Sequence, residues 1–453
     1  MKKTKIVCTI GPASNNEKTL KKMIEAGMNV ARFNFSHGDY KTQEANLELV
    51  KKLRAEMKRP IATMMDTKGP EIRFRDFEGG KISVKKGDIF TVSTKEFLGD
   101  STKGSITYKG LPNDVKAGDF LLVNDGLVQL IIKEIKKDEI ITEVAVGGEI
   151  SNHKGINAPG ADLKMPFLSE VDKKDLEFGI AHDYDYIALS FVRTAKDVED
   201  VRKIINDHGS KMKIIAKIES TQGVENIAEI LDAADGLMVA RGDMGVELPP
   251  EKVPYIQKKM IMAANAVGKI TITATQMLES MTHNPRPTRA EVADVANAVY
   301  DGCSAVMLSG ESANGEYPVE AVKMMSTICM ETEKHLHNEY FATSHSTMNL
   351  VAKSACDLAD TIGVDNIIVF TEKGRSTSLV SQVKPKTPVV ALTCNEKVYN
   401  QSAMLYGVDA HLIKGLIEQR ELEGYTRMYM EAKDIKSAVL LYGQNIDSIK
   451  VLM

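Results

Sequence analysis

Short apolar runs alternate with helical patterns along most of the chain. The runs are rich in β-branched residues, and each is followed by a segment whose apolar positions have helical spacing. The eight runs span residues 5–10, 29–35, 61–66, 186–191, 212–219, 236–243, 270–275 and 305–310. Continuous apolar runs are typical of strands covered on both faces of a parallel sheet. Eight strands alternating with helices predict an α/β fold built on a (β/α)8 TIM barrel, with an open doubly wound sheet as the alternative.

Two capping boxes mark expected helix starts. Ser14 lies three residues before Glu17, and Thr288 lies three residues before Glu291. In this pattern the hydroxyl and the carboxylate each accept a hydrogen bond from the other residue's backbone N–H. We therefore expect helices to begin directly after Ser14 and Thr288.

The alternation of strands and helices is interrupted twice. Residues 81–94, 119–135 and 139–150 alternate polar and apolar positions with period two, which predicts a small β domain inserted in a barrel loop over 71–161. Beyond residue 335, a helix at 348–363 and strands at 366–371, 388–393 and 437–443 predict a separate α/β domain over 336–453. The barrel is then formed by residues 1–70 and 162–335.

Polar side chains follow most of the predicted barrel strands. They are Arg32, Asn34, Ser36 and His37; Asp66, Thr67 and Lys68; Lys217 and Glu219; Arg241 and Asp243; Thr275; and Ser309 and Glu311. In a (β/α)8 barrel the carboxyl ends of the strands form one face, which carries the active site. We therefore expect these side chains to converge on a single site.

The residue types in this set indicate a metal and an anion. Taken alone, Lys217 and Glu219 are typical of a salt-bridged strand end, residues 241–243 of a turn, and His37 of a loop. Together, the carboxylates of Glu219 and Asp243 suit Mg²⁺ or Mn²⁺ better than zinc. The cations Arg32, Arg73 and Lys217 indicate an anionic substrate such as a phosphate. Gly242 would let the backbone approach a ligand closely.

Composition and charge exclude several classes of protein. A net charge of −4 over 453 residues, without a dense basic stripe, argues against binding to nucleic acid. The five cysteines form no C-x-x-C pair, so neither a zinc site nor a disulfide framework is indicated, and reduced thiols predict a cytoplasmic location. No apolar run approaches the length of a membrane span, and the apolar stretch near the N-terminus is too short for a signal peptide.

Seven motifs resemble those of the pyruvate kinase family, in the family's order. They are KIVCTIGPAS (5–14), NVARFNFSHG (29–38), MDTKGPEIR (65–73), IIAKIES (214–220), LMVARGDMGVELP (237–249), TATQMLESM with PRPTRAE (273–291) and MLSGESANGEYP (307–318). The resemblance implies a TIM barrel, an inserted small β-barrel lid and a C-terminal α/β domain for regulation and oligomerisation. It also implies transfer of the phosphoryl group of phosphoenolpyruvate to ADP, giving pyruvate and ATP in the last step of glycolysis.

The resemblance assigns roles to individual residues. Arg32, Lys217 and Thr275 are implied as catalytic, and substrate binding is implied for Arg32, Lys217, Ala240, Arg241, Gly242, Asp243 and Thr275. Glu219 and Asp243 are implied as ligands of Mg²⁺ or Mn²⁺, and Asn34, Ser36, Asp66 and Thr67 as ligands of K⁺. Glu71 matches a position that goes with K⁺ dependence in the family. Nucleotide binding is implied for Asn34, His37 and Arg73, near the hinge of the lid.

The chain departs from the family pattern at two places. Val171 stands where the family usually has a lysine, which leaves one nucleotide contact in doubt. Residues 371–377 resemble a loop that binds a phosphorylated effector, and the implied contacts are Thr371, Lys373, Gly374, Arg375, Ser376 and Thr377. The final segment, 442–453, lacks the Arg- and Gly-rich loop that would cover a second phosphate, so the effector is left open between a phosphorylated sugar such as fructose bisphosphate and a nucleotide. A homotetramer is implied as the assembly.

Two other functions remain possible on the residues alone. A Mg²⁺-dependent barrel lyase of the phosphoenolpyruvate/pyruvate type would also use Glu219 and Asp243, although it would need neither the lid nor Arg73. A non-catalytic effector-sensing module would keep the barrel but would be expected to lose Lys217 or a metal carboxylate, and all three are present.

Overall fold

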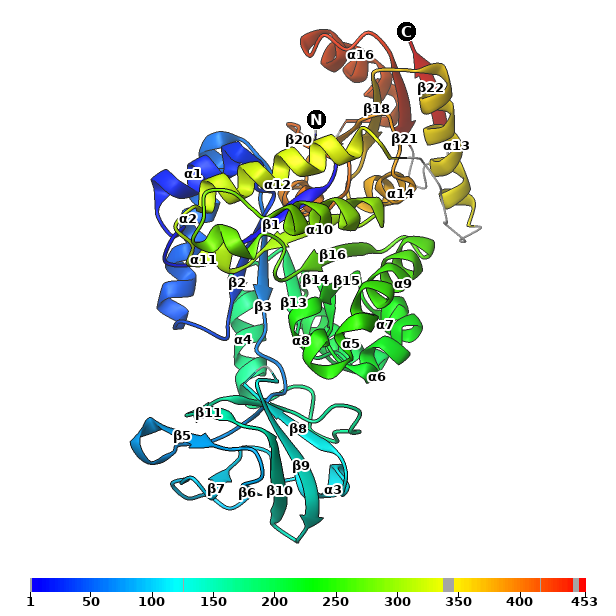
Figure 1. The fold of residues 1–453 in the computed structure, drawn as a ribbon. Helices are drawn as coiled ribbons and strands as arrows, with labels where there is room; N and C mark the ends of the chain where they lie inside the picture. The colour runs from blue at the N-terminus through cyan, green and yellow to red at the C-terminus, as the bar shows by residue number, and fades with distance from the viewer. Residues whose placement is uncertain (1, 125, 337–345, 416, 443–447) are drawn as a thin grey trace.

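Eight parallel strands close into a barrel in the computed structural model, which describes residues 2–124, 126–336, 346–415, 417–442 and 448–453 (Figure 1). The strands are β1 (Lys5–Thr9), β2 (Val30–Asn34), β3 (Ala62–Asp66), β13 (Tyr186–Leu189), β14 (Lys213–Ile218), β15 (Gly236–Ala240), β16 (Ile270–Ala274) and β17 (Ala305–Leu308). β1 pairs with both β2 and β17, which closes the ring and excludes the open sheet. The predicted TIM barrel is confirmed.

Helices surround the barrel strands. They include α1 (Glu17–Ala26), α2 (Tyr40–Met57), α4 (Glu170–Ala181), α5 (Ala195–Asp207), α7 (Ile227–Ala233), α9 (Val253–Ala266), α10 (Arg289–Tyr300) and α12 (Pro318–Glu333). Short helices α6 (Thr221–Glu225), α8 (Arg241–Glu247) and α11 (Gly310–Ala313) follow the carboxyl ends of β14, β15 and β17. Within the described ranges no helix has the length and apolar character required to cross a membrane.

One of the two predicted capping boxes is present. Thr288 and Glu291 form the expected reciprocal pair at the start of α10. The box predicted at Ser14 was wrong, because α1 is capped by Asn16, whose side chain accepts a hydrogen bond from Thr19 N–H at 2.9 Å. The Ser14 hydroxyl instead accepts from Gly11 N–H at 3.1 Å. Asn16 is as good a cap as serine and lies directly before the helix.

The inserted segment forms a β domain with its own hydrophobic core. Its elements are β4 (Ile72–Arg73), β5 (Lys81–Val84), β6 (Ile89–Ser93), β7 (Lys103–Ser105), α3 (Leu111–Asp114), β8 (Phe120–Val123), β9 (Val128–Ile135), β10 (Glu139–Val146), β11 (Gly148–Ser151) and β12 (Gly155–Asn157). The main sheet has the order β4-β12-β8-β9-β10-β6-β7, and β11 pairs with β5. In Figure 1 this domain stands at the end of the molecule opposite the C-terminal domain.

The C-terminal domain is a five-stranded sheet with helices. Its elements are α13 (Thr347–Ile362), β18 (Asn366–Phe370), α14 (Arg375–Val383), β19 (Val389–Thr393), α15 (Glu396–Gln401), β20 (Val408–Leu412), α16 (Leu422–Ala432), β21 (Ala438–Tyr442) and β22 (Ser448–Leu452). The order is β20-β19-β18-β21-β22, with β22 antiparallel to β21. Three strands were predicted, but β20 and β22 were not, because each mixes polar residues into a short run.

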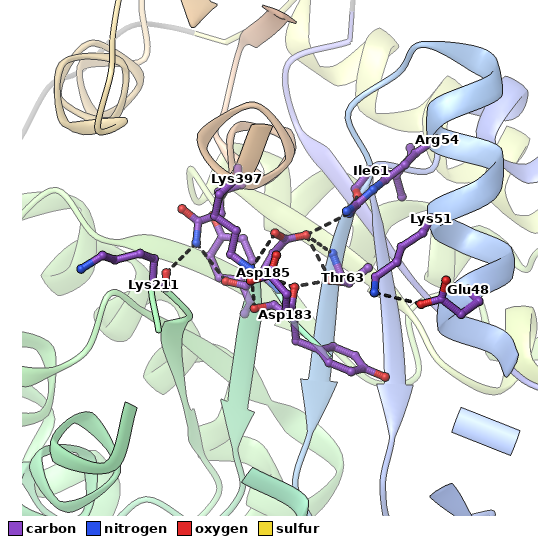
Figure 2. Close-up of polar contacts among 12 residues, drawn as sticks. Glu48, Lys51, Arg54, Ile61, Thr63, Asp183, Asp185, Lys211 and Lys397 are labelled. Atoms are coloured by element: carbon purple, nitrogen blue, oxygen red, sulfur yellow. Dashed lines mark hydrogen bonds and ion pairs between the residues drawn. The ribbon is translucent and has the colours of Figure 1, made fainter. Parts of the chain in front are cut away.

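The C-terminal domain packs against the amino ends of the barrel strands. Figure 2 shows Lys397, in the first turn of α15, beside Asp183 and Asp185, which lie just before β13. Lys397 Nζ donates to Asp183 O at 2.9 Å, to Asp183 Oδ1 at 2.7 Å and to Tyr184 O at 2.8 Å, and it lies 3.3 Å from Asp185 Oδ1. Asp185 is fully buried, and its other oxygen accepts from Thr63 N–H at 2.9 Å. One lysine therefore joins the two domains at β13, and Asp185 extends the contact to β3.

Lys397→Met is expected to weaken this junction. The variant removes the ammonium from the buried carboxylate of Asp185, which keeps its ion pair with Arg54 at 3.3 Å, so the loss should lie below the about 3 kcal/mol of a buried charge left without a partner. The urea midpoint of unfolding, followed by circular dichroism, should therefore fall. Lys196→Met is the control, because its pair with Asp200 is at least half exposed and such pairs contribute ~0–1 kcal/mol. Equal midpoints for the two variants would show that the Lys397 contacts do not stabilise the protein.

Candidate active site

The carboxyl ends of β2, β3 and β14 bring four charged side chains into one buried cluster. Asp66 lies between two cations: its Oδ2 is 2.6 Å from Arg32 Nε, and its Oδ1 is 3.1 Å from Lys217 Nζ. Lys217 Nζ also lies 3.0 Å from Glu219 Oε1, as expected for residues two apart on a strand. Each of the four is at most 9% exposed, so the charges interact through protein rather than through water.

The surrounding charges keep Asp66 and Lys217 ionised. Burial by itself would raise the pKa of Asp66, but the charges of Arg32 and Lys217 outweigh it and lower that pKa. Burial would likewise lower the pKa of Lys217, yet the carboxylates of Asp66 and Glu219 raise it. The ammonium therefore stays charged at neutral pH, which is the state that stabilises an anion.

Only one of the two carboxylate oxygens of Glu219 accepts a hydrogen bond from a described residue, and the other has its ion pair with Lys217 alone. Its Oε2 accepts a hydrogen bond from Phe191 N–H at 2.7 Å, whereas its Oε1 has no hydrogen bond from any described residue. Burial raises the pKa of this carboxyl to about 7, with Lys217 opposing the shift and Asp243 adding to it. Buried polar atoms are nearly always bonded, so this oxygen indicates a place for a ligand, and a carboxylate suits a hard cation.

Asp243 lies in a helix rather than at the end of a strand. The strand predicted over 236–243 was too long, because β15 ends at Ala240 and α8 begins at Arg241. Asp243 is half-buried in the first turn of α8, and its charge contributes to the raised pKa of Glu219. In the described part of the chain no three His, Cys, Asp or Glu side chains gather in a metal-binding arrangement. A cation held by these two carboxylates would therefore take its other ligands from water or substrate, which Mg²⁺ accepts.

The Arg241 side chain supports the loop that carries Thr275. Its guanidinium donates to Ala274 O at 3.2 Å, to Thr275 O at 2.7 Å and to Asp294 Oδ1 at 2.6 Å. Thr275 has φ of 69°, a left-handed conformation that strains a β-branched residue. Its hydroxyl donates to Ala274 O at 2.6 Å and accepts from Gly242 N–H at 2.8 Å. Arg241 thus holds a strained turn beside the predicted substrate site.

The four residues predicted to bind K⁺ come from two neighbouring strands. Asn34 is the register partner of Asp66, and Thr67 follows Asp66 directly. Asn34 Oδ1 accepts from Ser36 N–H at 3.1 Å, and Ser36 itself is exposed. Thr67 is buried, and its hydroxyl accepts from Ser190 N–H at 3.2 Å. Asp66 therefore belongs both to this predicted set and to the charged cluster.

A cleft of about 640 Å³ separates the inserted domain from the barrel. Its walls include His37, Glu71, Arg73 and Asp243, which were predicted, and Arg193 and Glu247, which were not. Asn157 of the inserted domain donates across it to Glu247 Oε1 of α8 at 2.9 Å. The charged walls are mixed in sign, as expected for a site that takes an anion together with cations.

The predicted nucleotide residues lie around this cleft. Arg73 forms an ion pair with Glu71 and donates to His153 O at 2.7 Å. His37 is exposed and also borders a second cleft of about 450 Å³, which Arg32 and Asn34 line as well. Val171, which replaces the expected lysine, is 57% exposed.

Glu311, one of the predicted polar residues, has structural partners instead of joining the cluster. Glu311 is fully buried, and it accepts from Leu278 N–H at 3.0 Å and from Ser309 N–H at 2.7 Å. It ties together the loops that follow β16 and β17. Burial raises the pKa of Glu311, and these backbone donors oppose that shift.

The predicted effector loop lies in the C-terminal domain, at the start of α14. Thr371 accepts from Gly374 N–H at 3.0 Å, and Gly374 has φ of 79° directly before the helix. Lys373 and Arg375 are exposed, whereas Thr377 is buried with no hydrogen bond to its hydroxyl among the described residues. Part of the final segment, 443–447, falls outside the described residues, so the expectation for that segment is untested.

Comparison with known proteins identifies the family. Residues 1–322 match a model described as the barrel domain of pyruvate kinase, and residues 349–441 match its alpha/beta domain. The chain belongs to the pyruvate kinase family. It is 46% identical to the pyruvate kinase of Clostridium acetobutylicum over 416 residues, covering 90% of this chain and 88% of that protein. Against the pyruvate kinase of Clostridium perfringens the identity is 47% over 418 residues, with the same coverage of both chains.

The fold agrees with a solved structure of the family. The crystal structure of a pyruvate kinase from Cryptosporidium parvum matches with a TM-score of 0.95 at 36% identity, covering 100% of this chain and 96% of that one. The protein is thus a phosphotransferase that moves a phosphoryl group between phosphoenolpyruvate and ADP, as the motifs implied. Neither the barrel lyase nor the non-catalytic module is favoured.

Sequence reasoning missed three residues of this site. Ser190 was read as part of the strand at 186–191, although it follows β13 and contacts Lys217. Thr9, which accepts from Arg32 at 2.8 Å, was likewise read as strand. Asp294 lies on α10, within a helical pattern, and nothing local signals its pairing with Arg241. A polar residue near the carboxyl end of an apolar run is the signal that could have found the first two.

Proposed function

We propose that the enzyme works with one divalent cation, Mg²⁺ or Mn²⁺, held by Glu219 and Asp243. The observation that carries this proposal is the buried Glu219 Oε1, which has an ion pair at 3.0 Å but no hydrogen bond within the described chain. When bound, such a cation neutralises charge on the substrate and its phosphoryl group. Among the described residues no third His, Cys, Asp or Glu joins these two carboxylates, so substrate oxygens would complete the coordination shell.

Lys217 and Arg32 are proposed to bind the phosphoryl group. Arg32 is held by Asp66 and by Thr9, so its guanidinium is fixed before substrate arrives. Lys217 is held by its ion pair with Asp66 at the end of β3. Its ammonium would stabilise the negative charge that develops on the phosphoryl group and the enolate. Because both cations are fixed in advance by a shared carboxylate, the site needs little reorganisation during transfer.

The turn from Ala240 to Asp243 is proposed to hold the substrate carboxylate through backbone amides. Thr275 lies beside it, with its hydroxyl bonded to Gly242 N–H and to Ala274 O. A hydroxyl is a weak acid, so we propose that a water molecule next to Thr275 delivers the proton to the enolate carbon. Arg241 acts here through its hold on Thr275 O rather than through contact with substrate.

A potassium ion is proposed at Asn34, Ser36, Asp66 and Thr67. All four offer oxygen ligands, the donor type that hard cations prefer. Glu71 supports this proposal through the family position that it occupies, and it pairs with Arg73 at the mouth of the cleft. Asn34, His37 and Arg73 are proposed to contact the nucleotide phosphates, with closure of the inserted domain excluding water from the reacting group.

Replacing K⁺ by Na⁺ is expected to lower the activity several-fold. The purified protein should form pyruvate from phosphoenolpyruvate, ADP, Mg²⁺ and K⁺ in an assay coupled to lactate dehydrogenase. With Na⁺ as the only monovalent cation the rate should fall, because the smaller ion fits a site built for K⁺ poorly. An equal rate in the two salts at matched ionic strength would reject the potassium site, while absence of pyruvate in both would reject the proposed function.

The remaining assignments concern assembly and regulation. We propose a cytoplasmic homotetramer with domain bounds at 1–70 and 162–335, 71–161 and 336–453. The effector loop at 371–377 is proposed to bind the phosphate of a sugar or a nucleotide, since exposed Lys373 and Arg375 flank the uncapped start of α14. Sedimentation of the purified chain tests the assembly, and titration of each candidate effector against substrate saturation tests the loop.

A further inference from the structure

The loop after β13 makes a short contact with the catalytic lysine. Ser190 Oγ accepts a hydrogen bond from Lys217 Nζ at 2.6 Å, which is shorter than the 3.1 Å from Lys217 to Asp66. The same hydroxyl donates to Thr67 O at 2.6 Å. Ser190 is 2% exposed, so water does not compete for these bonds. One serine therefore links β3, β13 and β14 at the point where the lysine lies.

The next residue in the loop holds the proposed metal ligand. Phe191 N–H donates to Glu219 Oε2 at 2.7 Å, and Phe191 has φ of 57°. A bulky side chain in the left-handed region is uncommon and persists only where surrounding contacts enforce it. Two adjacent residues of one loop thus fix Lys217 of β14 and Glu219 directly after it: Ser190 through its side chain and Phe191 through its backbone.

The position of the Ser190 side chain is itself fixed by packing. Gly69, with φ of 74°, lies so close that a Cβ on it would be 2.8 Å from Ser190 Cβ. Ser190 N–H also donates to Thr67 Oγ1 at 3.2 Å, so the two residues are joined by a pair of hydrogen bonds. The hydroxyl that meets Lys217 therefore has little freedom to move.

The hydrogen bonds of the Lys217 ammonium indicate the role of Ser190. Of its three N–H groups, one is bound by Asp66 and one by Ser190. The third has no hydrogen bond to any described residue, although Glu219 Oε1 lies 3.0 Å from the nitrogen. A serine oxygen fixes the ammonium without adding another negative charge, so the positive charge remains available to an anion.

We propose that Ser190 is a positioning residue that aims the third N–H of Lys217 at the substrate. This inference rests on the role proposed above for Lys217. Ser190 does not touch the reacting atoms. It fixes the ammonium between Asp66 Oδ1, at 3.1 Å, and Glu219 Oε1, at 3.0 Å, through a neutral oxygen at 2.6 Å.

The test is a comparison of Ser190→Ala and Ser190→Cys with the intact enzyme. Both variants remove the hydroxyl acceptor, and the thiol of the second, a weak acceptor slightly larger than the hydroxyl, leaves no cavity. A misplaced catalytic group costs up to roughly 100-fold, so kcat should fall roughly 10- to 100-fold in both. KM for phosphoenolpyruvate and the affinity for Mn²⁺, measured directly by electron paramagnetic resonance, should stay unchanged, because Glu219 keeps its Phe191 contact.

Two controls separate this proposal from a structural effect and from failure of the proposed function. Ser402→Ala removes a buried hydroxyl of the same kind, which donates to Val398 O at 2.7 Å, and should leave kcat unchanged. Lys217→Met should lose activity in the same assay. A kcat near that of the intact enzyme in both Ser190 variants, or a kcat loss accompanied by an equal loss of Mn²⁺ affinity, overturns the positioning role. Retained activity in Lys217→Met overturns instead the role proposed for the lysine.

Discussion

Lys217→Met is expected to lower kcat by about 1000-fold while leaving the fold intact, since removal of a single charge-stabilising group at an active site has effects of that order. Methionine matches the length of the lysine stem but carries no charge. The variant therefore loses the stabilisation of the negative charge that develops on the phosphoryl group and the enolate. The cluster should survive because Arg32 still neutralises Asp66 at 2.6 Å. Steady-state rates give the effect on kcat, and Mn²⁺ binding measured by electron paramagnetic resonance shows whether the metal site is retained.

Lys213→Met provides the matched control. Lys213 begins the same strand, β14, at the amino end of the barrel, so the variant removes a lysine from that strand without touching the site. Its kcat should equal that of the intact enzyme. If both lysine variants lost the same fraction of activity, the effect would belong to β14 as a whole, and Lys217 would have no special role in transfer.

Glu219→Gln is expected to weaken Mn²⁺ binding by at least ~100-fold, the upper end of what even outer residues of metal sites contribute. The amide oxygen of glutamine can still accept from Phe191 N–H, so the loop should keep its position, but the negative charge that attracts the cation is lost. Mn²⁺ affinity is measured on the free protein, without substrate, so the result does not depend on activity. Activity should fall in parallel when Mg²⁺ is held at the level that saturates the intact enzyme.

Glu225→Gln distinguishes a ligand from a general electrostatic effect. Glu225 lines the same cleft and carries the same charge, but it is exposed on α6. Its amide variant should bind Mn²⁺ nearly as well as the intact protein. Equal weakening in the two variants would mean that the cleft attracts the cation by its overall charge, and Glu219 would then lose its assignment as a ligand.

The approximate position of the site could be predicted from the sequence, but the ion pairs between its side chains could not. Lys217 and Glu219 were expected on one face because side chains alternate along a strand, and the structure puts their charged atoms 3.0 Å apart. By contrast, Asp66 was expected only as an oxygen ligand, yet it pairs with both Arg32 and Lys217. The partner of Lys217 on β3 is 151 residues away, and no local pattern encodes which side chain will face it across a closed barrel.

The contacts of Arg241 were likewise not predictable from the sequence. The family resemblance implied Arg241 only as part of the substrate-binding segment 240–243, and the sequence did not reveal that its guanidinium donates to Thr275 O and Asp294. The strand was expected to continue to residue 243, but the chain enters α8 at Arg241 and redirects the side chain. Where a strand stops is set by the packing of the next element, which a run of apolar residues does not reveal.

The sequence by itself determined the eight strands, the inserted β domain, the C-terminal α/β domain and the family, because periodicity and turn residues act over short distances. Only the tertiary structure decided which charges meet, that Ser190 and Phe191 fix Lys217 and Glu219, and that Lys397 joins the C-terminal domain to the amino end of the barrel. These contacts depend on strand closure and domain packing, which bring together residues far apart in the chain, and their energies arise only once water is excluded from between them.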